Sequence, residues 1–451
     1  MADMIKNGVH GASRVESYVA PKDPAVCEHL EWFKDQKLAL MIHFGIYSQV
    51  GIYESWPLSD GDAHWSRKDV DWETDAETFR EQYTNLNRSF NPVRFLPEQW
   101  ADFASEAGFK YLIFTTKHHD GFCMFDSEYT DYKVTAPDCP FHTHKYADIV
   151  GSVFDAFRAK GMGISAYFSK PDWHCSWYWA EGMERKVAHG RLATYDPADH
   201  PEVWEQFVQF THNQMMELVT KYGPIDVLWL DGGCVRPQNG QDIRLSELVA
   251  KARAHRPQLL VADRTVGGEN ENIITPEQSI PDTLIPVPWE SCVTIGTGFS
   301  FRFEDEYKTP RRLVNMLCDV VCRGGNLALN IGPQPDGRLP IGAMRSALGM
   351  GEWLKVNGDA IYGTRVCAPY EAGNLAFTKK ADSVYVIARL EEGETLSRKL
   401  FIPWTEEVGS VTLLADGSDV EFVTSDIGIT LTLPESLAET NPIAPAFRLD
   451  K

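Results

Sequence analysis

The sequence lacks long apolar runs and lacks an excess of positive charge. No stretch is long and apolar enough to span a bilayer, and the N-terminus has no apolar core of the kind found in signal peptides. Lys and Arg number 43 against 64 Asp and Glu, so the formal net charge is -21. This balance argues against nucleic acid or an anionic membrane as a partner. We expect a soluble, cytoplasmic protein that acts on a neutral molecule. The sequence does not indicate an oligomeric state.

The motifs of common metal, redox and nucleotide sites are also missing. The nine cysteines are scattered without the close pairs of a zinc or redox site, and we expect reduced thiols. There is no H-x-H at a strand end and no H-E-x-x-H, which argues against a metal-dependent hydrolase. The first predicted strand ends without G-x-G-x-x-G, the fingerprint of nucleotide-binding open sheets.

What the chain does contain is a repeated alternation of short apolar runs and helical patterns. Helical spacing is clear over residues 100–107 and 204–222. Strand followed by helix, repeated, predicts a parallel sheet in an α/β fold. We expect a (β/α)8-like TIM barrel rather than an open sheet, with some irregularity because not every strand is visible. The apolar runs cover residues 38–44, 110–116, 162–169, 225–230, 259–263 and 327–331.

Two regions depart from this alternation. Residues 264–303 show no helical period, and a loop of that length in a compact domain is usually functional. After about Tyr362, short alternating strands with turn residues predict an antiparallel β-sandwich. We therefore expect a barrel over residues 20–358 and a C-terminal β-sandwich domain over residues 359–451. The predicted sandwich strands cover residues 375–378, 384–390, 400–402, 411–414, 420–423 and 427–433.

Polar side chains follow several of the predicted barrel strands. An apolar strand ends in Asp231 and two glycines, and a second one breaks into His118 and His119. Barrel enzymes place their catalytic groups at the carboxyl ends of strands, so these side chains are expected to share one pocket. With several Trp residues nearby, such polar groups are typical of a carbohydrate site. The other strand ends supply His43, Tyr167, Ser169, Trp229, Asp263 and Arg264.

Three interpretations of this pocket differ in class. Each residue alone also fits a purely structural role. A metal-dependent hydrolase would use His and Asp at strand ends, but adjacent strand residues point to opposite sides, so His118 and His119 are not expected to ligate one ion. A sugar-binding protein without catalysis would lack a second carboxylate, whereas Glu277 and Glu290 are candidates for one. A carbohydrate-active enzyme uses all of these groups.

Four ordered segments resemble the α-L-fucosidases of glycoside hydrolase family 29. Each segment alone is weak, but the set is specific because the order is right over about residues 30–340. The resemblance implies a retaining exo-hydrolase with an N-terminal barrel and a C-terminal β-sandwich. It implies fucosylated oligosaccharides or glycoconjugates as substrates, and chemistry by carboxylates and water without a metal or organic cofactor. The segments cover residues 42–48, 117–122, 229–233 and 324–337.

The resemblance also implies roles for individual residues. Asp231 matches the family's nucleophile, and the acid/base lies in the long loop, where the context of Glu277 matches better than that of Glu290. Glu54 and Trp56 stand where the family often has an adjacent Glu-Trp pair. The residues implied to bind the sugar are His43, Glu54, Trp56, His118, His119, Tyr167, Trp229, Arg264 and Phe301. Residues 168–174, 275–278 and 289–292 resemble the branch that prefers α-1,3- and α-1,4-linked fucose.

Overall fold

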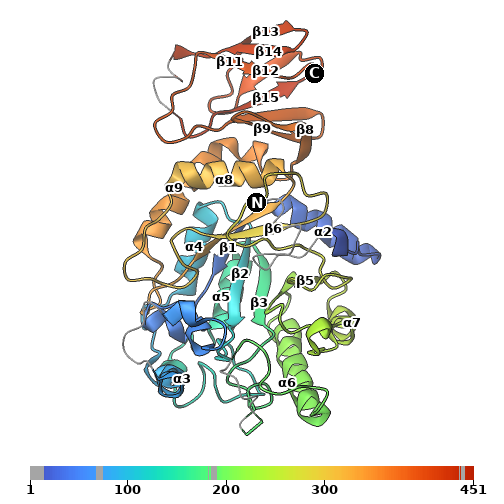
Figure 1. Cartoon of the computed structure of the whole chain (residues 1–451). Helices are drawn as coiled ribbons and strands as arrows, with labels where there is room; N and C mark the ends of the chain where they lie inside the picture. Colours follow the sequence, from blue (N-terminus) through green and yellow to red (C-terminus); the bar gives the residue numbers. More distant parts are fainter. Residues whose placement is uncertain (1–14, 68–74, 181, 184–189, 436, 438–441) are drawn as a thin grey trace.

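The structure is a computed structural model that describes residues 15–67, 75–180, 182–183, 190–435, 437 and 442–451. Within these residues, seven parallel strands form one curled sheet in the larger part of the molecule, in the order β5-β4-β3-β2-β1-β7-β6 (Figure 1). Six of them coincide, within two residues at each end, with the predicted apolar runs. The strands are β1 (Leu38–Ile42), β2 (Tyr111–Lys117), β3 (Gly163–Ser169), β4 (Val227–Asp231), β5 (Leu260–Asp263), β6 (Glu290–Thr294) and β7 (Asn326–Ile331).

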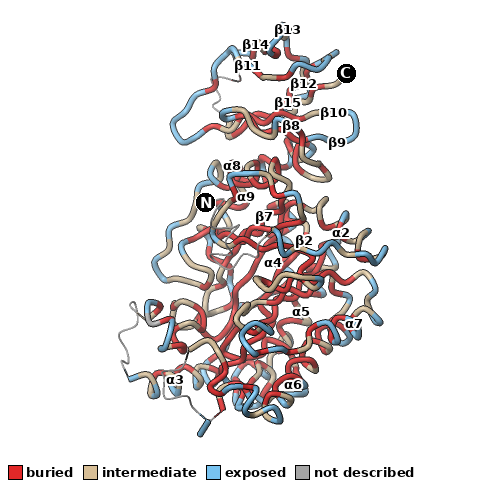
Figure 2. The backbone as a smooth tube through the Cα atoms, turned by 45° about the vertical axis from the view of Figure 1, so that its right-hand side comes forward, coloured by how far each residue is buried: buried red, intermediate tan, exposed pale blue. Residues whose placement is uncertain are grey.

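Both faces of this sheet are buried, as Figure 2 shows by the colour of its strands. Successive side chains of a strand point to opposite faces, so each strand contributes to two apolar cores. Met41 and Trp229 belong to a core inside the curl, whereas Leu40 and Leu228 belong to the larger core under the helices. This double burial explains why the strands appear as continuous apolar runs in the sequence. Polar groups are therefore concentrated where the strands end.

Helices follow most of the strands and cover the outer face of the sheet (Figure 1). Side chains cap free backbone N–H groups where helices begin, as Asp148 does for Gly151 at the start of α5. No helix among the described residues combines the length and apolar character needed to cross a membrane. The α-helices are α2 (Pro24–Gln36), α3 (Ala76–Thr84), α4 (Pro97–Glu106), α5 (Ile149–Ala159), α6 (Pro201–Thr220), α7 (Leu245–His255), α8 (Pro310–Cys322) and α9 (Ile341–Asn357). The 3-10 turns are η2 (Val15–Ser17), η3 (Ile46–Gln49), η4 (Trp56–Leu58), η5 (His64–Arg67), η6 (Asn85–Ser89), η7 (Pro140–Thr143), η8 (Pro237–Asn239) and η9 (Gly358–Ala360).

Residues 264–303 are not the one long loop that the sequence predicts, because they contain β6. This strand was missed because its sequence, ESCVT, has no apolar run although all five residues are buried. Residues 270–278 bond to both edge strands of the sheet. Asn272 N–H donates to Val261 O at 2.8 Å, and Glu290 N–H donates to Ile274 O at 2.8 Å. The described chain therefore joins the two edges with an irregular segment in place of a regular eighth strand.

The C-terminal part forms two antiparallel sheets that share a separate apolar core. The six predicted strands are present, and β8 and β15 were missed, β8 because it contains Pro369 and is mostly half-exposed. The sheet orders are β12-β15-β10-β9-β8 and β11-β14-β13. The strands are β8 (Arg365–Ala372), β9 (Leu375–Lys380), β10 (Ser383–Ala388), β11 (Lys399–Ile402), β12 (Ser410–Leu413), β13 (Glu421–Ser425), β14 (Gly428–Thr432) and β15 (Ala446–Asp450). The predicted domain boundary after residue 358 falls in η9.

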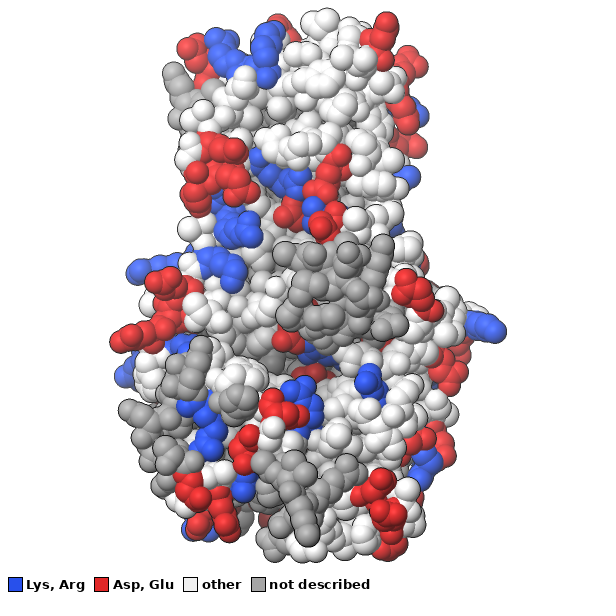
Figure 3. All heavy atoms as spheres, viewed as in Figure 1, with Lys and Arg blue, Asp and Glu red and all other residues white. Residues whose placement is uncertain are grey.

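The C-terminal sheets lie at the amino-terminal end of the parallel strands, with α8 and α9 between (Figure 1). Arg323, just before β7, pairs with Glu371 of β8 at 2.8 Å. Lys110, just before β2, lies over the ring of Tyr362 at 4.4 Å. The carboxyl ends of the parallel strands are therefore at the far edge, away from these sheets. On the face drawn in Figure 3, acidic and basic side chains are interspersed.

Candidate active site

A cavity of about 470 Å³ lies at the carboxyl edge of the parallel sheet. Its lining comes from the ends of the strands and from the loops that follow them, which is where barrel folds place their sites. The structure thus brings together most of the predicted residues, although they are spread over more than 230 positions of the sequence. Those that line the cavity are His43, Glu54, Trp56, His118, His119, Tyr167, Asp231, Arg264 and Glu277.

Asp231 ends β4, and its carboxylate has three close hydrogen-bond donors. Oδ2 accepts from Tyr167 Oη at 2.6 Å, and Oδ1 accepts from Gly232 N–H at 2.7 Å and from Arg264 Nη1 at 3.2 Å. Burial acts to raise the pKa of Asp231, but the Arg264 charge and these hydrogen bonds outweigh it, so the pKa lies well below its ordinary value. Asp231 is therefore ionised at neutral pH, as a carboxylate nucleophile must be.

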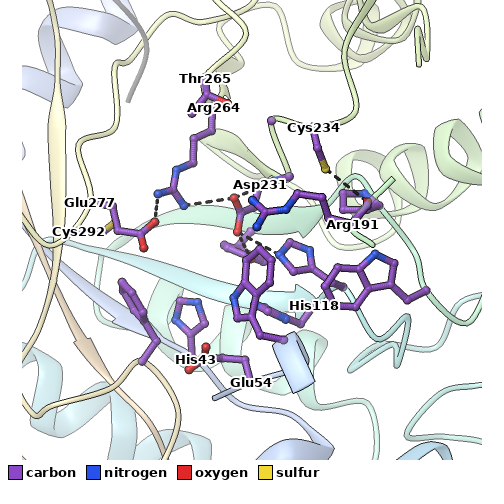
Figure 4. Close-up of a pocket in the computed structure, with 18 of the residues that line it drawn as sticks. His43, Glu54, His118, Arg191, Asp231, Cys234, Arg264, Thr265, Glu277 and Cys292 are labelled. Atoms are coloured by element: carbon purple, nitrogen blue, oxygen red, sulfur yellow. Dashed lines mark hydrogen bonds and ion pairs between the residues drawn. The ribbon is translucent and has the colours of Figure 1, made fainter. Parts of the chain in front are cut away.

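Arg264 follows β5 and holds a second carboxylate, that of Glu277. Its Nη2 contacts Glu277 Oε2 while its Nη1 contacts Asp231, so the guanidinium lies between the two acids (Figure 4). The irregular segment between β5 and β6 carries Glu277, and backbone pairing with Cys292 of β6 holds it in place. The Glu277 side chain is 33% exposed, against 17% for Asp231. The pocket thus offers one ionised, largely enclosed carboxylate and one carboxyl group nearer to solvent.

Three histidines form another part of the pocket wall. The expectation that His118 and His119 point to opposite sides was wrong. β2 ends at Lys117, so both residues follow the strand, and both line the cavity with ring centroids 4.4 Å apart. Burial lowers the pKa of His43 and of His119 to about 4, and it holds the pKa of His118 well below its usual range. All three rings are neutral at physiological pH and offer hydrogen bonds without charge.

His118, His119 and Asp231 also form the one group of candidate metal ligands found among the described residues. Their ligand atoms lie within 4.8 Å of one another. The group fits a cation poorly, because the Asp231 carboxylate already accepts three hydrogen bonds. One of these comes from the positively charged Arg264 at 3.2 Å, and this charge would repel a metal ion. That the protein uses no metal stays a prediction.

Glu54 and Trp56 both line the cavity although Ser55 separates them. Glu54 has a backbone φ of 35°, in the left-handed region, which turns the chain sharply at this point. Burial raises the pKa of Glu54 to about 7, and its Oε1 accepts a hydrogen bond from Ser300 N–H at 2.8 Å. The hydroxyl of Ser55 bonds to His118 Nδ1 at 2.6 Å. The intervening serine therefore supports a pocket histidine.

Trp229, predicted to line the pocket, lies one layer beneath it. Its indole is fully buried and stacks against the ring of Tyr167, with centroids 5.2 Å apart. The Arg264 guanidinium lies over it, 5.4 Å from the ring centroid. Trp229 points the same way as Asp231 on β4, but Tyr167 and Arg264 cover it. It therefore supports two residues of the pocket from below.

Phe301, like Trp229, was predicted to bind the sugar but is not among the described residues that line the cavity. Its ring contacts that of Phe303. Phe299 takes the place expected for Phe301, with its ring 4.9 Å from that of His43. Its backbone carbonyl accepts a hydrogen bond from Asn330 of β7 at 2.7 Å, which fixes this loop to the sheet. A shift of two residues in a loop without periodicity leaves no trace in the sequence pattern.

Arg191 and Trp65 are pocket residues that sequence reasoning missed. Arg191 lies on the long connection between β3 and α6, where it pairs with Asp62 at 2.8 Å and stands 5.1 Å from the ring centroid of Trp56. Trp65 lines the cavity while remaining 48% exposed. Both come from irregular connections, so neither follows a spacing that could have marked it. The density of Trp near the predicted strand ends was the only available signal.

Glu290, the alternative acid/base, is not among the described residues that line the cavity. It is the first residue of β6 and lies inside the curl of the sheet, 1% exposed. The Tyr111 hydroxyl and the Trp229 indole N–H, the latter at 3.1 Å, both donate to its carboxyl group. Burial raises the pKa of Glu290 to about 7. Its position makes it a core residue that holds Trp229.

Comparison with known proteins agrees with this geometry. The family model for alpha-L-fucosidase matches residues 9–359. The chain belongs to the alpha-L-fucosidase family. It is therefore a glycoside hydrolase, and the resemblance of the four sequence segments to this family is confirmed.

Known fucosidases align with this chain over most of its length. The alpha-L-fucosidase of Branchiostoma floridae is 28% identical over 432 residues, which cover 91% of this chain and 90% of that protein. The plasma alpha-L-fucosidase of Homo sapiens is 28% identical over 422 residues, which cover 90% of this chain and 85% of that protein. At this coverage the alignments extend beyond the parallel sheet into the C-terminal part of the chain.

Solved fucosidase structures share the fold. Alpha-L-fucosidase isoenzyme 1 from Paenibacillus thiaminolyticus superposes with a TM-score of 0.78 and 30% identity, over 94% of this chain and 99% of that one. The alpha-fucosidase of Thermotoga maritima in complex with fucose gives a TM-score of 0.75 and 29% identity, over 96% of this chain and 100% of that one. The curled parallel sheet with antiparallel sheets at the C-terminus is thus the architecture of known fucosidases.

Replacing Glu290 with Gln should make this fucosidase more stable at alkaline pH. A carboxyl group whose pKa is raised by folding binds its proton more tightly in the native state, so stability is lost as pH rises from about 4.5 through 7. Glu290→Gln removes this loss, up to about 3 kcal/mol, while keeping an oxygen for the Trp229 N–H. Urea unfolding at pH 5 and pH 8.5 measures the difference. An equal effect of the substitution at both pH values would contradict this account.

Proposed function

We propose that this fucosidase is a retaining exo-hydrolase that releases terminal α-L-fucose through a covalent fucosyl-enzyme intermediate. The observation that carries the proposal is that Asp231 and Glu277 contact neighbouring nitrogens of one guanidinium, that of Arg264. Retaining glycosidases hold their two carboxyl groups about 5–5.5 Å apart, whereas inverting enzymes need about 6.5–9.5 Å to admit a water between them. Two carboxyl groups that contact the same guanidinium fit the shorter separation, which is that of a retaining enzyme.

In the first step, Asp231 attacks the anomeric carbon C1 of fucose. The C1–Oδ bond forms as the glycosidic C1–O bond breaks, and Glu277 gives its proton to the departing oxygen. In the second step, Glu277 takes a proton from a water whose oxygen attacks C1, and the Asp231 carboxylate leaves. The greater exposure of Glu277 supports its part in this scheme, because it must meet both the leaving group and water. Carboxylates and water complete the reaction without a metal or organic cofactor.

The rest of the pocket suits a neutral 6-deoxy sugar. His43, His118 and His119 offer hydrogen bonds to hydroxyl groups and carry no charge near neutral pH. Trp173 and Phe299 add apolar faces that can pack against a sugar ring and its methyl group. The Thermotoga maritima relative has been solved with fucose and with a mechanism-based inhibitor, which supports fucose as the sugar bound here.

We also propose a preference for α-1,3- and α-1,4-linked fucose on oligosaccharides or glycoconjugates. The basis is the resemblance of residues 168–174, 275–278 and 289–292 to the branch of the family with that preference. All three segments contribute lining residues to the cavity, namely Pro171, Trp173, Glu277 and Cys292. Differences between branches at these positions would therefore act directly on the bound substrate.

Replacing Asp231 with Gly should remove nearly all turnover of an aryl α-L-fucoside. Without the carboxylate no ester forms, and we expect a loss of roughly 10³-fold or more in kcat. Azide can enter the vacated space and attack C1 directly, so it should partly restore turnover and yield a fucosyl azide. Initial rates with and without azide measure both effects, and circular dichroism checks the fold. Normal activity in a folded Asp231→Gly protein would refute the assignment of the nucleophile.

Replacing Glu277 with Ala should impair substrates according to their leaving groups. Natural oligosaccharides need the proton of a general acid, so kcat/KM should fall about 10²- to 10⁴-fold for them. Activated aryl fucosides, whose phenolate leaves unaided, should lose far less. Glu290→Gln is the matched control and should show no such dependence on the leaving group. If the Glu290 variant shows the dependence and the Glu277 variant does not, the acid/base is Glu290.

The linkage preference is tested with a panel of substrates assayed side by side. Lewis-type trisaccharides, which carry α-1,3- or α-1,4-linked fucose on N-acetylglucosamine, should be hydrolysed with higher kcat/KM than α-1,2-linked 2′-fucosyllactose. An aryl fucoside serves as the common reference for the glycone site, because it has no second sugar. Equal or higher kcat/KM for 2′-fucosyllactose would rule out the proposed preference and leave the fucosidase chemistry intact.

A further inference from the structure

The ring proton of His43 is placed by a chain of two hydrogen bonds. Its Nδ1 lies 2.6 Å from Oδ1 of Asn330, on β7. The amide nitrogen of Asn330 donates to the backbone carbonyl of Phe299 at 2.7 Å. A carbonyl oxygen can only accept, so Asn330 must turn its NH2 group to Phe299 and its oxygen to His43. The oxygen can accept only if His43 carries its proton on Nδ1.

Ser169, the last residue of β3, places the ring proton of His119 in the same way. The Ser169 hydroxyl donates to the carbonyl of Pro171 at 2.7 Å, which uses its single proton. Its oxygen also contacts Nδ1 of His119. With its proton committed to Pro171, this oxygen can only accept from the ring. His119 therefore also carries its proton on Nδ1.

Both rings then present a bare Nε2 lone pair. Burial lowers the pKa of each ring to about 4, so each is neutral and holds one proton. His119 Nε2 lies 3.8 Å from Oδ2 of Asp231, which is too far for a hydrogen bond between them. Two acceptors thus lie near each other in the lining of the cavity. A donor, such as a hydroxyl group of the substrate, fits between them.

The opposite tautomer would weaken the nucleophile. A proton on Nε2 of His119 would place a further N–H group 3.8 Å from the Asp231 carboxylate, which already accepts from Tyr167, Gly232 and Arg264. The positive end of an N–H dipole near an ionised carboxylate stabilises that form and makes its lone pairs less available for attack on C1. The contact of His119 with Ser169 avoids this cost.

We propose that Ser169 and Asn330 are positioning residues that lock His119 and His43 as hydrogen-bond acceptors for the hydroxyl groups of the sugar. Ser169 also keeps the ring N–H group of His119 on the side away from Asp231. This inference rests on the proposed function, since it takes fucose as the donor of the hydroxyls. A pocket built from acceptors discriminates against sugars that lack a hydroxyl at the matching position, because the acceptor is then left unpaired.

The tautomers can be observed by NMR of protein labelled with ¹⁵N in its histidine rings. In the wild-type protein, His43 and His119 should carry their protons on Nδ1. In Ser169→Ala, the acceptor for that proton is gone, and the proton of His119 should move to Nε2, where the negative charge of Asp231, 3.8 Å away, favours it. Spectra of His43→Gln and His119→Gln identify the two signals among the 13 histidines. Detection of the Nε2–H form of either ring in the wild type, or an unchanged His119 in Ser169→Ala, would overturn the proposal.

Ser165→Ala is the matched control for this variant. Ser165 is buried on the same strand, four residues earlier, and its hydroxyl has no hydrogen-bond partner among the described residues. Ser165→Ala removes a side-chain oxygen from a buried position on β3, as Ser169→Ala does, but this oxygen bonds to no histidine. The tautomer of His119 and the kinetics should therefore stay as in the wild type.

Kinetics with modified sugars test the consequence for binding. Ser169→Ala should lower kcat/KM for an aryl α-L-fucoside about tenfold, the size of one hydrogen bond. Three monodeoxy analogues lack the 2-, 3- or 4-hydroxyl group. The loss caused by Ser169→Ala should be smallest for the analogue that lacks the hydroxyl group donating to His119. An equal loss with all three analogues would overturn the assignment of His119 as a hydroxyl acceptor. If the wild type leaves every fucoside intact, the proposed function fails, while the NMR result still decides the tautomers.

Discussion

The pocket depends on the guanidinium of Arg264, which allows two carboxyl groups to share one enclosed space. Without a counter-charge, burial would favour protonation of Asp231, and a second acid nearby would add repulsion. The pairing of β4 with β5 positions this counter-charge, because Leu230 of β4 lies opposite Asp263 of β5. The next residues along these two strands are Asp231 and Arg264. The register of two neighbouring strands therefore sets the ion pair at the centre of the site.

Two further pairs of opposite charges are buried near the pocket, where burial itself keeps the histidines uncharged. Lys170 pairs with Asp263 at 2.5 Å, and Lys117 pairs with Asp172 at 2.8 Å, all with side chains almost fully buried. Lys117 ends β2 just before His118, and Asp263 ends β5 just before Arg264, so both pairs are held beside pocket residues. Within each pair the opposite charges offset each other, which leaves neutral groups to bind the sugar.

The sequence predicted the site residues whose positions follow from the parallel sheet. It did not predict those whose positions depend on the loops. His43, Asp231 and Arg264 were found because parallel strands bring their carboxyl ends to one edge. His118 and His119 were expected to diverge because the alternation of a strand was applied to them, although the predicted run ends at residue 116 and β2 ends at Lys117. Alternation holds only within a strand, so it says nothing about two residues that follow one. The loop residues Arg191, Phe299 and Trp65 carried no periodic signal at all.

The irregular segment between β5 and β6 shows why the pattern breaks near the site. A regular eighth strand would complete the sheet, but its side chains would alternate strictly between the inner and outer faces. Gln278, next to Glu277, instead has a φ of 48°, and Thr265 and Glu54, which line the cavity, have φ values of 66° and 35°. Left-handed backbone at such residues costs on the order of 1–3 kcal/mol each, and it persists only where surrounding contacts hold it. The ion pair of Arg264 with Glu277 and the backbone bonds of Pro276 and Gln278 to Cys292 of β6 supply such contacts. The strain therefore lies where side chains must converge on a substrate.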